Sequence, residues 1–232
     1  MTRVLVPVAV LEGRTVPQGL IDLLGTMDVT VLGYHVVPEQ TAPDQAREQY
    51  GARAADVLED ITAEFRAAGG DADYRLVFTH DRHKTRRRIA SETDARVLAL
   101  VGATGPVERV LVPLTGEVAT DRILTFVEEL IGRREISVTM LLADDDSAEA
   151  RTRLEAAVDR LTDAEITARS ELAVDGSPFD ALVAAAAEHD VVVIGERAPS
   201  LRSLVFGDEA ERTAAETVGS VLVVRRNGAT ER

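Results

Sequence analysis

The sequence contains no cysteine and only one lysine, and each scarcity limits what the protein does. Without cysteine it forms no disulfide, offers no thiolate to a metal and has no thiol nucleophile. Lys84 is the single lysine, so arginine supplies the other 25 of 26 basic residues. They are outnumbered by 40 acidic residues, which gives a net charge of −14. This composition predicts a halophilic source, where salt screens the repulsion between carboxylates, although a GC-rich genome also enriches arginine.

Long apolar runs are also missing. No stretch of about eighteen apolar residues occurs, so we expect no membrane span. No cleavable leader precedes the first predicted strand, and we therefore expect a cytoplasmic protein. The negative charge disfavours nucleic acid as a partner, because phosphates would be repelled. With 232 residues, 45% of them hydrophobic, the chain can nevertheless bury a sizeable core.

The pentapeptide RVLVP occurs twice, at Arg3–Pro7 and again at Arg109–Pro113. An identical strand-like segment at this distance suggests an internal duplication. After each copy, short apolar runs alternate with segments of helical periodicity, which predicts parallel α/β sheets with right-handed crossovers. We therefore predict two tandem units, residues 1–105 and 106–232. The first unit would lack its last helix and strand, because only the short connection at 102–108 separates the two copies.

Apolar periodicity and turn signals predict the individual elements. The strands are expected at 4–8, 29–37, 74–78, 97–101, 110–114, 136–142, 166–174, 191–194 and 221–224. Helices are expected at 16–24, 42–68, 84–93, around 123–130, around 154–161 and through 188 from an N-cap at Ser177 followed by Pro178. The long helix at 42–68 should bury one stripe of side chains, namely Tyr50, Ala54, Val57, Leu58, Ile61 and Phe65.

The segment after the strand at 191–194 is the most informative about function. Gly195 ends the strand, an irregular segment runs to Gly207, and a polar helical stretch leads to the last strand. Parallel sheets bind ligands at the carboxyl ends of their strands, where this segment begins. VLVPL, DGSPFDALVAAAAEHDVVVIG and GSVLVVRR together resemble the universal stress protein (UspA-like) family. The resemblance implies two open parallel-sheet units of the Rossmann-like, adenine-nucleotide alpha-hydrolase-like type, and a role in the stress response.

The resemblance also identifies departures from the ATP-binding members of that family. Those members carry Gly, two residues, Gly, nine residues, Gly and then Ser or Thr. Here Ala198 replaces the second glycine and adds a β-carbon where the backbone should approach phosphate. Only eight residues, instead of nine, separate this position from Gly207. Asp208 replaces the final hydroxyl donor and brings a repelling charge. Thr115, and Ala9 in the first half, stand where an aspartate usually contacts the nucleotide.

The resemblance therefore predicts a regulatory or binding module with impaired or lost ATP binding. The cofactor-binding positions would be Pro113, Thr115, Gly195, Arg197, Ala198, Gly207 and Asp208. We expect no cofactor, with ATP or another adenine nucleotide as the alternative, because the arginine at 197 can pair with phosphate. No catalytic triad is recognisable, so we expect no enzyme. The alternatives are weak ATP hydrolysis, or a purely structural loop.

The segment Arg82–Arg88, RHKTRRR, is an exception in an acidic chain, since five of its seven residues are cationic. It lies at the predicted start of a helix, an end that prefers negative charge. Either it is a solvated face paired with acidic neighbours, or it binds a phosphate, a nucleotide or a protein partner. His80 and His83 are three residues apart, but no third ligand has suitable spacing, so we expect no metal site.

Two partner predictions follow from the resemblance and from this segment. In the family the last strand often pairs with its counterpart in a second subunit, and residues 220–224 keep the required apolar edge. We therefore predict a homodimer through residues 220–224. Residues 82–88 suggest the alternative of an accessory interaction subunit of a transporter or regulator, which would dock through this basic segment.

Overall fold

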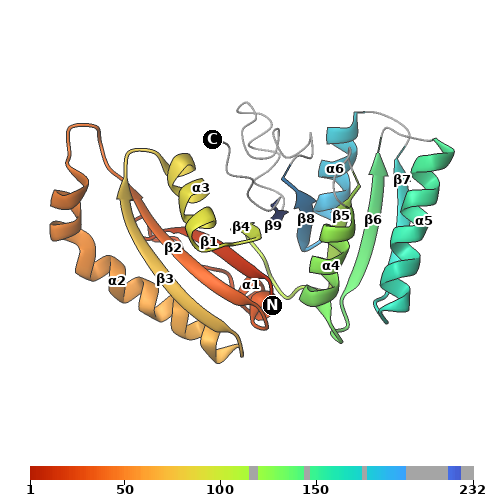
Figure 1. Ribbon diagram of the computed structural model, residues 1–232, viewed down its shortest axis with the longest axis horizontal. Coiled ribbons are helices and arrows are strands. Elements are labelled where there is room, and N and C mark those ends of the chain that lie inside the picture. Colours follow the sequence, from red (N-terminus) through yellow and green to blue (C-terminus); the bar gives the residue numbers. More distant parts are fainter. Residues whose placement is uncertain (115–119, 144–146, 174–176, 197–218, 226–232) are drawn as a thin grey trace. The chain divides into compact units, whose positions relative to one another are not determined.

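The structure is a computed structural model that describes residues 1–114, 120–143, 147–173, 177–196 and 219–225. The described chain forms two compact units, residues 1–101 and 102–225 (Figure 1). Each unit alternates strands and helices, as the apolar runs and periodic segments predict. The elements of the first unit are β1 (Arg3–Ala9), α1 (Gln18–Leu24), β2 (Asp28–Val36), α2 (Pro43–Ala67), β3 (Asp71–Thr79), α3 (Arg82–Glu92) and β4 (Val97–Leu100).

The strands of the first unit form a parallel sheet in the order β3-β2-β1-β4. The first RVLVP copy lies in β1, in the middle of this sheet. Its register places Arg3 beside Asp28 of β2 and Val4 beside Val97 of β4. The Arg3 guanidinium also binds the Asp28 carboxylate, with Nε–Oδ2 and Nη2–Oδ2 distances of 2.9 and 2.8 Å.

Helices cover both faces of this sheet, and two neighbouring residues of β2 show which helix covers which face. A Cβ placed on Gly33 would lie 2.5 Å from Cδ1 of Leu58 in α2. The preceding residue, Leu32, packs instead with Ile89 and Ala90 of α3. Because successive strand residues point to opposite faces, α2 and α3 lie on opposite sides of the sheet.

The second unit has one strand more among the residues that the structure describes. Its parallel sheet has the order β9-β8-β5-β6-β7, and the second RVLVP copy lies in β5. The elements are β5 (Arg109–Pro113), α4 (Thr120–Ile131), β6 (Ser137–Ala143), α5 (Ala148–Asp163), β7 (Ala168–Ala173), α6 (Pro178–Ala187), β8 (Val191–Gly195) and β9 (Ser220–Val224).

Side-chain caps and one arginine fix the helices of the second unit. The predicted N-cap at Ser177 is confirmed, since its Oγ accepts from the N–H of Phe179 at 3.2 Å. Ser147 caps α5 in the same way. Arg160 of α5 binds both carboxylate oxygens of Glu128 in α4, from Nε at 2.7 Å and from Nη2 at 3.1 Å. This fork-to-fork pair fixes α5 against α4.

The core predictions hold for the inner strands and fail at the periphery. In α2, Ala54, Leu58, Ile61 and Phe65 are buried as predicted. Val57 is only half-buried, and Tyr50 is 37% exposed, so the prediction that Tyr50 is in the core is wrong. The outer strands β3 and β7 also retain exposed residues, so they are not buried on both faces as the inner strands are. An outer strand has a neighbour on one side only and needs fewer apolar residues.

Gly51 lies in the middle of α2, where a side chain would fit. An added Cβ would meet only Cγ of Arg47, at an ordinary contact distance of 3.6 Å. We expect Gly51→Ala to raise the free energy of unfolding by about 0.5–1 kcal/mol, because alanine loses less backbone entropy in a helix. Urea unfolding measures the change. Gly33→Ala is the matched control and should lower stability, since its Cβ would overlap Leu58; a loss with Gly51→Ala would contradict the prediction.

Candidate functional site

Strand order locates one candidate site in each unit. From β5 the chain continues to β6 and β7 on one side, and then returns to place β8 on the other side of β5. In the first unit β4 follows β2 and β3 in the same way and pairs with β1. At such a switch point the connections leave neighbouring strands in opposite directions, and open α/β sheets bind ligands at the carboxyl ends of these strands.

Two of the predicted cofactor-binding residues lie at the switch point of the second unit. Pro113 is the last residue of β5 and Gly195 is the last residue of β8, and both are buried. β5 and β8 are adjacent and parallel, so the structure brings these two residues to the same edge of the sheet. Thr115, Arg197, Ala198, Gly207 and Asp208 lie outside the described residues.

Hydrogen bonds at both ends of β8 position Gly195. At the start, Oδ2 of Asp190 accepts from the backbone N–H groups of Glu108 and Arg109 at 2.9 and 2.8 Å. The Asp190 N–H donates in turn to the Arg109 carbonyl at 3.0 Å. At the end, the N–H of Glu196 donates to the carbonyl of Val224 in β9 at 2.9 Å. The strand that ends at Gly195 is therefore fixed against both of its neighbours.

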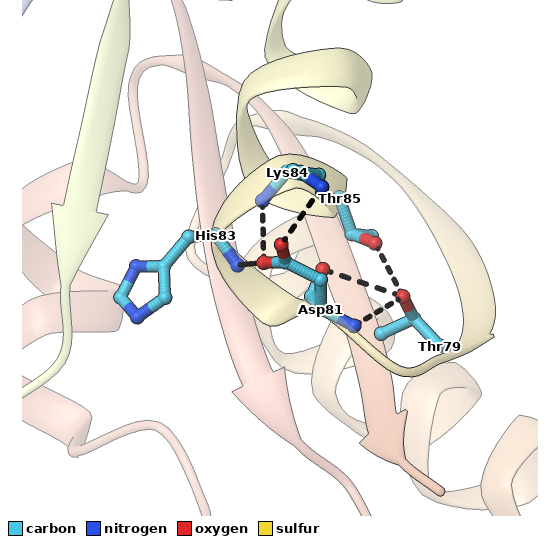
Figure 2. A network of polar contacts seen from close by, with 5 residues as sticks. All are labelled: Thr79, Asp81, His83, Lys84 and Thr85. Atoms are coloured by element: carbon cyan, nitrogen blue, oxygen red, sulfur yellow. Dashed lines mark hydrogen bonds and ion pairs between the residues drawn. The ribbon is translucent and has the colours of Figure 1, made fainter. Parts of the chain in front are cut away.

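The basic segment, residues 82–88, begins α3 and is the second candidate. The predicted helix begins at Lys84, whereas α3 begins two residues earlier, at Arg82. The cause is Asp81, whose Oδ1 accepts from the N–H groups of His83 and Lys84 at 2.9 and 3.0 Å (Figure 2). A carboxylate at this end also offsets the positive charge that follows.

Thr79 and Thr85 extend this cap into the loop before the helix. Oγ1 of Thr79 donates to the Asp81 carbonyl and accepts from the Asp81 N–H, at 3.3 and 3.1 Å. The Thr85 hydroxyl donates to the same Thr79 oxygen at 2.8 Å (Figure 2). The end of β3 and the first turn of α3 thus form one hydrogen-bonded unit, which fixes the place from which the basic side chains leave the helix.

Arg86 connects the basic segment to the carboxyl end of β2. Its Nη2 donates to the Tyr34 hydroxyl at 2.9 Å, and the guanidinium carbon lies 5.1 Å from the centre of the Tyr34 ring. Tyr34 is buried, and Arg86 is half-buried. The Arg86 Nε is also buried and has no hydrogen-bond partner. Ala9, at the end of β1, lies beside Tyr34 in the sheet, so this arginine stands at the edge where ligands bind.

His83 is held among positive charges. Partial burial lowers its pKa, and the guanidinium groups of Arg82, Arg86 and Arg87 lower it further, while Asp81 acts in the opposite sense. The Nε–H of Arg82 donates to Nε2 of His83 at 3.3 Å, a bond that requires a neutral imidazole. The pKa of Asp81 is also lowered, first by the hydrogen bond from the Lys84 N–H.

These two shifts predict how stability depends on pH. His83 binds a proton less readily in the folded protein, so the free energy of unfolding should fall as the pH drops below about 6.5. Asp81 stabilises the fold when it is ionised, and this contribution should be lost as the pH drops below about 3.8. Urea unfolding across this range should show both losses. His83→Gln should remove the first and Asp81→Asn the second, whereas unchanged curves would contradict the assignment.

The described residues offer little support for a metal site. No three His, Asp or Glu side chains in the described ranges are grouped closely enough to hold a metal ion. Nδ1 of His80 contacts the Val37 carbonyl at 3.1 Å, and the His35 ring packs edge-on against Tyr50 and Phe78. Among the helices described, none has the length and apolarity needed to cross a membrane.

Sequence reasoning missed two residues of the basic candidate, Asp81 and Tyr34. Asp81 carried a readable signal, because an aspartate directly before a helix is a preferred N-cap. Tyr34 carried no such signal in the sequence, because its hydrogen bond with Arg86 forms only when α3 packs on β2.

Comparison with known proteins supports the fold. No protein-family model matches the sequence, and no curated protein matches it. A universal stress protein from Archaeoglobus fulgidus superposes over 97% of this chain and 96% of its own, with a TM-score of 0.65 and 15% identity. The cytoplasmic domain of a prokaryotic cation chloride cotransporter superposes over 98% and 96%, with a TM-score of 0.55 and 14% identity.

A protein from Pseudomonas aeruginosa superposes at a similar level, over 97% of this chain and 92% of its own, with a TM-score of 0.53 and 12% identity. At such identities the superpositions concern the fold and not the chemistry. The chain has the α/β fold with a mostly parallel central sheet that is also found in a universal stress protein.

Proposed function

We propose that the protein is a cytoplasmic, universal-stress-protein-like module of regulatory function, whose second unit keeps the place of a nucleotide site but binds ATP weakly or not at all. The observation that carries the proposal is the position of Pro113 and Gly195 at the ends of adjacent strands. These strands flank a switch point, where this class of sheet binds ligands. The similar fold of a universal stress protein supports the assignment.

Duplication explains why the chain has two such units. Both RVLVP copies lie in the first strand of their unit. In each unit this strand pairs with the second strand on one side and with the fourth strand on the other. Val4 lies beside Val97 as Val110 lies beside Val191. Among the described residues, β4 is the last strand of the first unit, whereas the second unit has β9 after its fourth strand.

Impaired ATP binding rests on the sequence after Gly195. Ala198 and Asp208 remove one close backbone approach and one hydroxyl donor, and the aspartate adds a negative charge. The first test is calorimetric titration of the whole protein with Mg-ATP at up to about 5 mM, together with thermal unfolding. We expect no saturable heat and no stabilisation. Stabilisation that is lost in Gly207→Val would overturn the proposal in favour of a nucleotide-handling protein.

A role beside a transporter is the second candidate function. The similarity in fold to the cytoplasmic domain of a cation chloride cotransporter, over nearly the whole chain, favours it. The protein would then act as an accessory subunit that docks through the basic segment. Replacing Arg87 and Arg88 by glutamate should abolish capture of that partner, and capture that is unaffected would exclude this surface.

The homodimer through residues 220–224 remains a prediction. The N–H of Ser220, at the start of β9, already donates to Oγ1 of Thr104 in the same unit at 3.0 Å. This end of the strand is therefore not available to a second chain. Light scattering at physiological salt decides the question, because a monomer mass would remove the prediction.

A further inference from the structure

The cations of the basic segment divide between two flanks of α3. Lys84 and Arg88, four residues apart, face carboxylates: Lys84 Nζ lies 3.7 Å from Asp81 Oδ2, and Arg88 Nη1 lies 2.7 Å from Glu92 Oε1. His83, Arg86 and Arg87 are three and four residues apart and share another flank. In the part of the chain that the structure describes, neither Arg86 nor Arg87 has a carboxylate within ion-pair distance.

Other residues hold the side chains of this second flank in place, so the flank is more than an exposed charged surface. Arg86 is fixed over the Tyr34 ring by its hydrogen bond to the hydroxyl, so its guanidinium has one orientation at the carboxyl edge of the sheet. His83, Arg86 and Arg87 occupy positions i, i+3 and i+4 of α3, so their side chains leave the helix on the same side. The N-terminal amides of His83 and Lys84 do not belong to this surface, because the Asp81 carboxylate occupies them.

We propose that His83, Arg86 and Arg87 form a binding site for a phosphoryl group in the first unit. A phosphate monoester or inorganic phosphate carries close to two negative charges and offers three oxygens, enough for two guanidinium forks and an imidazole at once. A carboxylate offers two oxygens and one charge, which one arginine satisfies. The net charge of −14 also repels a large acidic partner more than it repels a small anion.

The site goes beyond the proposed function, because it lies in the first unit and uses none of the residues after Gly195. Its ligand has two sources, free phosphate or the phosphate of a small ester. AMP serves as the ester probe, since tighter binding of AMP than of inorganic phosphate would assign the ester. Binding of either probe here is independent of whether the second unit binds ATP, so the two proposals can fail separately.

The experiment follows the four histidines of the whole protein by NMR while inorganic phosphate replaces chloride at constant ionic strength. Phosphate should raise the pKa of His83 and leave the NMR signals of His189 in place, because His189 is buried with both ring nitrogens contacted. Replacing Arg87 by Gln should weaken phosphate binding by about ten-fold, the loss expected for one charge-assisted contact. Arg87 is exposed, so this variant should fold like the parent protein.

A matched pair of variants separates a site from general electrostatics. Lys84→Gln with Arg88→Gln removes two positive charges from the paired flank, and it should change phosphate affinity less than Arg87→Gln does alone. Arg86→Lys keeps the charge but loses the fork over Tyr34, and it should also weaken binding. The proposal is overturned if phosphate leaves His83 unchanged, if the paired-flank variant weakens binding equally, or if an oligoglutamate peptide shifts His83 and phosphate does not.

Discussion

Gly219→Ala should cost the second unit about 3 kcal/mol or more of its free energy of unfolding, among the largest effects expected of one methyl group. A Cβ at this position would overlap the carbonyl oxygen of Asp190 and would lie 3.2 Å from its carbonyl carbon. The obstacle is backbone, so no side-chain rotation relieves it. The backbone of Asp190 cannot shift away either, because its N–H and its carboxylate are both hydrogen-bonded at the start of β5. Alanine would thus force β9 away from β8.

Gly105→Ala is the matched control in the same unit, because an added Cβ there meets nothing within 4 Å. We expect the control to unfold in urea within about 0.5 kcal/mol of the parent protein, as surface substitutions usually do. Amide hydrogen exchange should show that Gly219→Ala exposes the N–H groups of β8 and β9 first. Equal stability of the two variants would show that the segment before β9 can shift without loss.

The architecture was predictable because its strongest signals are local. Short β-branched runs such as Val191–Ile194 need burial on both faces, and this requirement alone predicts inner strands of a parallel sheet. The Ser177-Pro178 pair marked the start of α6 at the correct residue, because a hydroxyl cap and a fixed φ act within one turn. The RVLVP repeat likewise predicted two equivalent strands, and both copies have the same kinds of neighbours in the structure.

The candidate sites were less predictable, because they depend on contacts between elements distant in sequence. Tyr50 fits the apolar stripe of α2, but the residue is 37% exposed. Arg86 and Tyr34 are 52 residues apart and meet only because α3 packs on β2. Asp190 reads as an ordinary loop aspartate, yet it accepts two hydrogen bonds from the chain more than 80 residues earlier. Periodicity carries no information on any of these contacts.

Introducing two residues of the ATP-binding universal stress protein pattern into the second unit should create ATP binding. The double variant Ala198→Gly with Asp208→Ser removes a β-carbon and a negative charge and supplies a hydroxyl donor. A hydrogen bond to a charged group contributes about 1.5–3 kcal/mol, so affinity for Mg-ATP should rise by about 10- to 100-fold in a calorimetric titration. Pro113 and Gly195 already end adjacent parallel strands, at the edge where we propose the nucleotide site.

The control for charge alone is Asp163→Ser, which removes one carboxylate from the last turn of α5. This residue precedes β7 and therefore lies at the amino end of the sheet, away from the switch point. If net charge limited ATP binding, both variants would bind more tightly, and the increase would shrink in high salt as the charges are screened. If the residues after Gly195 limit it, only the restored variant gains affinity, and adding Gly207→Val to that variant should abolish the gain. A restored variant that binds no better than Asp163→Ser would mean that this segment is structural.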